Sequence, residues 1–284
     1  MHANAQPAAA ARILVVEDTP ELSQMLVHLL AAAGYRAETA SDGREALERL
    51  ERESFDLLLL DVWMPRMNGL ELLAELRNRW VLTKCIVMTG DSTPETLLQA
   101  VREQAYQFVV KPIEPTTLLE LVAETLAASP IVPAIEVVSA LPHWVELLVP
   151  CQIEAADRIQ NFLDKLESGL PLEVRRAVGA AFRELLLNAI EWGGKFDPSR
   201  KVRIAYLRLK KMLLYRIADP GAGFRLEELK HAAVVNPDDP TAHIEAREQK
   251  GLRPGGFGIL MAQSLVDEVV YNESRNEVVL VKYL

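Results

Sequence analysis

A chain of 284 residues, of which 50% are hydrophobic and 25% charged, is long for one hydrophobic core and sufficient for two. Its net charge is −9, and the acidity belongs to the first half: residues 12–129 hold 11 Lys and Arg against 19 Asp and Glu, and the rest hold 20 against 21. An acidic chain without a basic stripe is a poor candidate for direct nucleic-acid binding, because neutralisation of phosphates dominates that affinity. Any control of genes would therefore act through other proteins.

The sequence predicts no association with a membrane. No apolar run approaches the roughly 20 residues of a membrane-spanning helix, and residues 1–11 lack the basic start and apolar core of a signal peptide. We expect residues 1–11 to be a disordered lead. Cys85 and Cys151 are far apart in the sequence and suit buried thiols in a reducing compartment better than a disulfide. We therefore expect a cytoplasmic protein.

Short apolar runs alternate with helical patterns between residues 12 and 128. The run Arg12–Val16 ends at two carboxylates, Glu17 and Asp18, and the run Leu57–Leu60 ends at Asp61. Five strands that alternate with five helices predict a doubly wound α/β domain with a five-stranded parallel sheet. Further strands are predicted at 85–88 and 108–110, and helices at 22–33, 44–51, 70–77, 96–103 and 118–127.

Polar residues at the ends of these strands would gather at one edge of the sheet, where ligands of such folds bind. Glu17, Asp18 and Asp61 would repel one another unless a cation joined them, and Mg²⁺ bound by carboxylates and waters fits this arrangement. Thr89 and Lys111 follow two other strands and would offer a hydroxyl and a positive charge to a tetrahedral anion. The set predicts phosphoryl transfer with an aspartate as acceptor.

Residues 12–128 resemble the receiver domain of two-component response regulators, which has a CheY-like, flavodoxin-like fold. The resemblance rests on Glu17-Asp18, on Asp61 with Met64-Pro65 and Asn68-Gly69 after it, on Thr89, and on Lys111-Pro112.

This resemblance implies a role for each matching residue. Asp61 would accept a phosphoryl group from a sensor histidine kinase or a phosphotransfer protein, and Thr89 and Lys111 would contact that group. Phe108 occupies the aromatic switch position, Lys111-Pro112 is a candidate cis peptide, and Gly90 stands where the family usually has alanine. The implied Mg²⁺ ligands are Glu17, Asp18, Asp61 and the backbone carbonyl of Trp63.

Residues 129–142 are predicted to be a linker, because prolines at 130, 133 and 142 bracket a stretch that neither helical nor strand periodicity fits. They also discourage the long dimerisation helix of a conventional histidine kinase. His143 follows Pro142 directly, and a solvated or capping role suits it better than phosphoacceptance.

The second half, residues 143–284, predicts an α+β sandwich with a mixed, mostly antiparallel sheet covered by helices. Helical periodicity is found at 154–166, 172–192 and 257–267, and strand-like runs at 144–149, 201–209, 212–218, 268–272 and 277–284.

Two polar residues interrupt the apolar face of the helix at 172–192. Glu184 and Asn188 are spaced i,i+4, so a carboxylate and a carboxamide can address the same ligand. Asp219 begins a glycine-rich segment with Gly221 and Gly223, where a carboxylate could accept a hydrogen bond from an exocyclic amine beside a flat base. Free N–H groups at a helix start favour phosphates, and Gly255, Gly256 and Gly258 lie at such a start. We interpret the stretch 225–253 as a mobile lid, in which Arg253 could reach the phosphates.

Residues 143–284 resemble the ATPase superfamily shared by gyrase, histidine kinases and mismatch-repair proteins (GHKL), and within it the anti-sigma-factor serine kinases. By this likeness Asn188 binds Mg²⁺, Asp219 reads adenine, and Glu184 is the general base that takes a proton from a serine or threonine of a partner. Trp192 departs from the histidine or tyrosine common in that family, and the spacing of the second glycine motif is slightly unusual.

The chain is thus predicted to be a two-component signalling protein in which phosphorylation of Asp61 regulates an ATP-binding kinase module, with Mg²⁺ and ATP as cofactors. Its target would be a sigma factor, an anti-sigma antagonist or another protein, and homodimer formation stays open. Two alternatives also stay open. The module could be a non-catalytic, ATP-dependent partner-binding switch, or an atypical histidine kinase that acts on a histidine of another protein.

Overall fold

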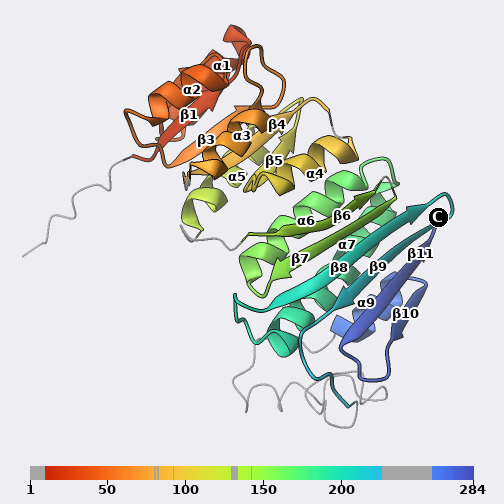
Figure 1. The fold of residues 1–284 in the computed structure, drawn as a ribbon. Helices are drawn as coiled ribbons and strands as arrows, with labels where there is room; N and C mark the ends of the chain where they lie inside the picture. The colour runs from red at the N-terminus through yellow and green to blue at the C-terminus, as the bar shows by residue number, and fades with distance from the viewer. Residues whose placement is uncertain are drawn as a thin grey trace, which may run out of the picture. The chain divides into compact units, whose positions relative to one another are not determined.

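The chain divides into two compact units, residues 1–131 and 132–284 (Figure 1). The computed structural model describes residues 10–79, 81, 83–91, 93–128, 134–141, 143–225 and 258–284. Among these residues, no helix is both long and apolar enough to cross a membrane.

The first unit is a five-stranded parallel sheet with helices between its strands, as predicted. The sheet order is β2-β1-β3-β4-β5, so the chain reverses its direction of winding after β2. The elements are β1 Arg12–Val16, α1 Pro20–Ala32, β2 Arg36–Ala40, α2 Gly43–Leu50, β3 Leu57–Asp61, α3 Gly69–Asn78, β4 Lys84–Thr89, α4 Pro94–Arg102, β5 Gln107–Val110 and α5 Pro115–Ala127.

The position of a strand in this sheet explains its sequence. The central strand β3 is buried along its whole length, which is why four consecutive leucines predict it. The edge strand β2 has the sequence Arg-Ala-Glu-Thr-Ala and is only partly buried. No apolar run marks β2, so the sequence alone indicates no residue range for this strand.

The second unit is a six-stranded sheet in the order β10-β11-β9-β8-β7-β6, and its described pairings are all antiparallel. Figure 1 shows the helices α6, α7 and α9 on one face of this sheet. Side chains of β7 and β9 alternate between buried and partly buried, as expected for a sheet covered mainly on one side, whereas β8 has three consecutive buried residues in its middle. The elements are β6 Glu136–Leu141, β7 Trp144–Pro150, α6 Ile153–Leu166, α7 Leu172–Asn188, the π-helical turn η1 Ala189–Gly193, β8 Lys201–Leu209, β9 Met212–Ala218, α9 Gly258–Leu265, β10 Glu268–Tyr271 and β11 Glu277–Tyr283.

The strand β6 corrects one prediction. We predicted a linker through residue 142, whereas residues 136–141 pair with β7 as the outermost strand of the sheet. A bulge at Val138 interrupts the pairing, and every residue of β6 is exposed or only partly buried. The alternation of apolar and polar residues that reveals a half-buried strand is therefore weak in this segment.

A carboxyl group lies inside the core of the second unit. Glu167, directly after α6, is 2% exposed and accepts a hydrogen bond from the hydroxyl of Tyr215 on β9. The Tyr215 ring packs against Phe182 of α7 and Tyr206 of β8, with centroid distances of 4.9 and 5.1 Å. This cluster joins the central strands of the sheet to α7, the helix that carries Glu184 and Asn188.

Candidate functional site

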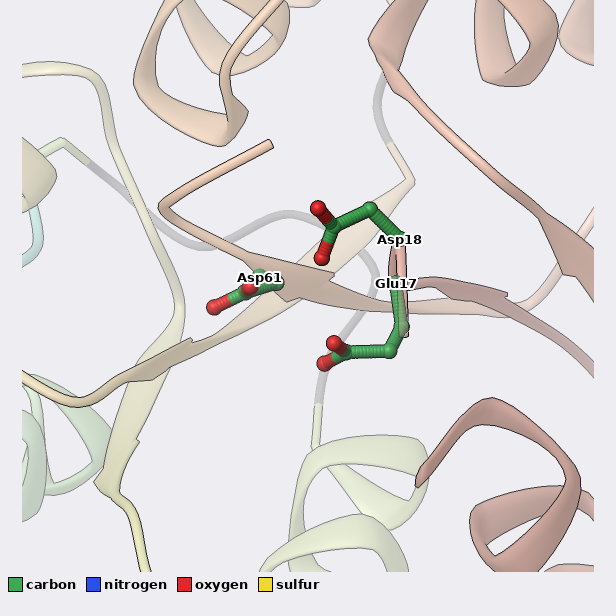
Figure 2. Close-up of side chains that lie close together, drawn as sticks. All are labelled: Glu17, Asp18 and Asp61. Carbon is green, nitrogen blue, oxygen red and sulfur yellow. The ribbon is translucent and has the colours of Figure 1, made fainter. Parts of the chain in front are cut away.

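The first candidate site is an acidic cluster at the carboxyl ends of β1 and β3. These strands are parallel neighbours, with Val16 opposite Leu60, so the residues that follow them emerge side by side. One carboxylate oxygen from each of Glu17, Asp18 and Asp61 lies within 4.8 Å of the others (Figure 2). Glu17 and Asp61 are buried, whereas Asp18 is exposed. The structure thus brings together the three carboxylates that the sequence predicts to meet.

Lys111, which follows β5, bridges two of these carboxylates. Its Nζ lies 2.8 Å from Glu17 Oε2 and 3.0 Å from Asp61 Oδ1, and the Lys111-Pro112 peptide is cis, as predicted. Burial alone would lower the pKa of Lys111, but hydrogen bonds to Glu17 and Asp61 raise it above its usual value. The lysine therefore stays charged and partly neutralises the cluster.

The phosphoacceptor candidate Asp61 has a perturbed carboxyl group. Burial raises the pKa of Asp61 above its usual value, and the bonds from Lys111 and from the backbone N–H of Trp63 oppose this shift. The Trp63 side chain itself is 60% exposed. All three carboxylates of the cluster offer oxygen ligands, the donor type that suits a hard divalent cation such as Mg²⁺.

Thr89 lies at the end of β4, but its hydroxyl is bonded to the following loop. Thr89 Oγ1 donates to the carbonyl oxygen of Asp91 at 2.8 Å and accepts from the Asp91 N–H at 2.9 Å. To contact a phosphoryl group on Asp61, Thr89 would have to exchange at least one of these bonds. Phe108 is buried on β5, and a methyl group at Gly90 would have no neighbour within 4 Å.

Gly69 contributes to this site in a way that the motif alone does not explain. It begins α3, and a Cβ at this position would lie 2.1 Å from the carbonyl oxygen of Asp61. Its N–H donates to Val62 at 3.0 Å, and Asn68 caps α3 in a capping box with Glu71. These contacts hold the start of α3 directly against the end of β3.

The second candidate site lies at the end of α7. Glu184 and Asn188 are one turn apart on this helix. A methyl group at Gly258, the first residue of α9, would lie 2.7 Å from Glu184 Oε2 and 3.3 Å from Asn188 Nδ2. Two predicted site residues therefore meet a third one at the start of a helix, 70 residues further along the chain.

Asp219 follows β9 and packs against the end of the same helical segment. Its Oδ1 accepts from the Gly221 N–H at 2.7 Å, and a Cβ at Gly193 would lie 2.2 Å from that oxygen. Burial raises the pKa of Asp219, whereas the Gly221 N–H and the nearby charge of Arg200 lower it. The wide turn η1 brings Gly193 to this position. Gly193 was not among the predicted site residues, because π-helical geometry leaves no periodic signal.

The structure requires a glycine at position 223 for a different reason from the predicted one. We predicted that it lets the backbone approach a base, but its φ is +83° and a Cβ would lie 1.6 Å from the Ser274 carbonyl oxygen. Trp192 lies in η1 and is 43% exposed. Gly255, Gly256, Arg253 and nearly all of the predicted lid lie outside the described residues.

Comparison with known proteins assigns a family to each unit. Residues 13–123 match the family model of the response regulator receiver domain, and residues 149–282 match that of the histidine kinase-like ATPase domain. The chain is 32% identical over 110 residues to the chemotaxis protein CheY of Thermotoga maritima, an alignment that covers 38% of this chain and 92% of CheY.

Two further relatives differ in how much of their length is matched. The alkaline phosphatase synthesis transcriptional regulatory protein PhoP of Bacillus subtilis is 29% identical over 243 residues, 77% of this chain and 98% of PhoP. The CAI-1 autoinducer sensor kinase/phosphatase CqsS of Vibrio cholerae is 36% identical over 115 residues, 39% of this chain but only 17% of CqsS. The chain therefore belongs to the response regulators of two-component signalling, and its CheY-like receiver domain is followed by a histidine kinase-like ATPase domain.

Proposed function

We propose that phosphorylation of Asp61 regulates an ATP-dependent protein kinase site formed by α7 and the start of α9. The observation that carries the kinase site is the convergence of Glu184, Asn188 and Gly258. Receiver domains generally take their phosphoryl group from sensor kinases, so a sensor histidine kinase or a phosphotransfer protein would be the donor.

In the receiver, an Asp61 oxygen would attack the phosphorus atom of the donor's phosphohistidine. A P–O bond forms as the P–N bond breaks, and Lys111, already 3.0 Å from Asp61, would pair with the new phosphate oxygens. Glu17, Asp18, Asp61 and the Trp63 carbonyl would hold Mg²⁺ here, and Asn188 would hold it in the ATPase domain. When bound, Mg²⁺ supplies positive charge that neutralises phosphate oxygens.

In the ATPase domain, Glu184 would take the proton of a serine or threonine hydroxyl on the target. The hydroxyl oxygen then attacks the γ-phosphorus of ATP, and the bond to the bridging β–γ oxygen breaks to release ADP. Asp219 would accept a hydrogen bond from the exocyclic amine of adenine. Its half-buried position against Gly193 and Gly221 supports this role. The start of α9 at Gly258, together with Gly255 and Gly256 before it, would meet the phosphates with backbone N–H groups.

A sigma factor, an anti-sigma antagonist or another signalling protein would be the target. The glutamate at the base position and the resemblance to anti-sigma-factor serine kinases support this choice, and the acidic chain argues against DNA as a direct ligand. Both cysteines are free and buried, which supports a reducing, cytoplasmic compartment.

Labelled ATP tests the kinase assignment. The full chain is incubated with labelled ATP and candidate partner proteins, beside Glu184→Gln and a matched control, Glu173→Gln, whose side chain is exposed at the start of α7. Loss of a general base should slow transfer by about 10²–10⁴-fold in Glu184→Gln, and Glu173→Gln should keep the wild-type rate. The label on the target should survive acid, as expected for phosphoserine or phosphothreonine.

Other outcomes identify the alternatives. An acid-labile label on a histidine of the target would make this chain a histidine kinase. Partner binding that requires ATP but persists unchanged in Glu184→Gln, without any labelled product, would make it a binding switch.

A further inference from the structure

The turn between β10 and β11, residues Asn272–Asn276, is fastened to the segment that carries Asp219. The N–H of Asp219 donates to the Asn276 carbonyl oxygen at 2.8 Å, and the N–H of Phe224 donates to the Ser274 carbonyl oxygen at 3.1 Å. Between these two points, Asn276 Nδ2 donates to the Gly221 carbonyl oxygen at 3.1 Å. The segment 219–224 is thus held at its beginning, middle and end.

The carboxamide of Asn276 is itself fixed in orientation. Its Oδ1 accepts from Asn272 Nδ2 at 2.8 Å and from Ser274 Oγ at 2.9 Å. Because the oxygen is engaged by two donors, the NH₂ group points at Gly221. Among side chains of this length, only asparagine offers an acceptor and a donor from the same planar group. Aspartate has the same shape but, when ionised, no donor.

The segment 219–224 and the turn Asn272–Asn276 are also closely packed against each other. Gly223 approaches Ser274 so closely that a Cβ would lie 1.6 Å from its carbonyl oxygen. Phe224 packs edge-on against Tyr271 with a centroid distance of 5.8 Å, and the Arg275 guanidinium lies 5.9 Å from the Phe224 ring centre. The backbone at Gly221 is therefore held by β10, β11 and their turn, together with Arg200, whose guanidinium donates to the adjacent Pro220 carbonyl oxygen at 2.6 Å.

Gly221 in turn orients the carboxylate of Asp219, because its N–H donates to Asp219 Oδ1 at 2.7 Å. An exocyclic amine would then donate to Oδ2. We infer that Asn276 is a positioning residue for nucleotide recognition, which fixes Gly221 so that Asp219 presents Oδ2 to the amine of adenine. This inference rests on the proposed function of the ATPase domain.

The test compares ATP with inosine triphosphate, which has a carbonyl oxygen in place of the exocyclic amine. Binding and turnover of both nucleotides are measured on the full chain for the wild type, Asn276→Asp and Asn276→Ala. The wild type should prefer ATP. The ratio of its affinities for ATP and inosine triphosphate should fall by about tenfold in both variants, as expected for the loss of one well-placed hydrogen bond. The KM for ATP should rise while kcat stays near the wild-type value, because Glu184 and Asn188 are untouched.

Ser274→Ala is the matched control, since it removes one donor to Asn276 Oδ1 but keeps the bond to Gly221. It should keep the preference for ATP. If the wild type prefers ATP and both Asn276 variants show the same preference as the wild type, the role of Asn276 is refuted while the ATP site stands. If the wild type itself does not distinguish the two nucleotides, the proposed reading of adenine by Asp219 fails first.

Discussion

Glu167 shows how a single residue can make the stability of this fold depend on pH. Burial raises its pKa from 4.5 to about 7, while the Tyr215 hydroxyl and the charges of Arg208 and Arg175 act in the opposite direction. The folded state holds this proton more tightly than the unfolded chain does. The folded state is therefore stabilised at low pH and loses on the order of 3 kcal/mol as pH rises from about 4.5 to about 7.

Glu167→Gln should remove this dependence, because glutamine still offers an oxygen to Tyr215 but does not titrate. We expect the variant to unfold at a higher urea concentration than the wild type above pH 7, and the difference to shrink as pH falls toward 5. Urea midpoints at several pH values measure this. Glu173→Gln, on an exposed side chain, should follow the wild type. Equal pH slopes for Glu167→Gln and the wild type would contradict the expectation.

Single residues also show where prediction from the sequence succeeds. Glu17, Asp18, Asp61 and Lys111 could be placed together, because each lies at or just after the carboxyl end of a strand of one parallel sheet and such ends share an edge. The reason for Gly223 could not be found this way. It depends on contact with Ser274, 51 residues away, which only the pairing of β9 with β11 creates.

The start of α3 packs directly against the end of β3 beside Asp61. Gly69→Ala should cost about 1–3 kcal/mol, because the new Cβ meets backbone atoms of Asp61 that cannot move aside cheaply. It should also slow phosphorylation of Asp61 by a small-molecule donor such as phosphoramidate. Gly90→Ala is the matched control: its Cβ meets nothing within 4 Å, so stability should stay equal or rise by about 0.4–1 kcal/mol. Thermal midpoints and phosphorylation rates measure both effects, and equal behaviour of the two variants would refute the role of Gly69.

The elements that escaped prediction share a physical cause. The strands β2 and β6 are edge strands, covered only in part, and their sequences lack the apolar run or alternation that burial imposes. The helices and central strands were predictable, because burial on one or both faces selects their residues. The turn η1 was predicted as the end of a helix, since one extra residue per turn does not alter an apolar pattern over five residues.

Two units with separate chemistry on one chain predict communication between them. Beryllium fluoride bound at Asp61 mimics the phosphoryl group, and we expect it to change ATP turnover by at least about fivefold, the lower end of ordinary coupling between sites. Asp61→Asn should abolish the response without changing basal turnover. Turnover that is the same with and without the mimic would show that the receiver does not regulate the kinase site.

The bridge that Lys111 forms between Glu17 and Asp61 has a consequence for the energetics of signalling. The receiver carries its own monovalent counter-ion, so the arrival of Mg²⁺ would be an exchange of cations instead of the filling of an unpaired acidic cavity. Part of the attraction between Mg²⁺ and these carboxylates would be offset by the loss of their contacts with the ammonium group, so we expect weaker metal binding than at an acidic cluster without a lysine.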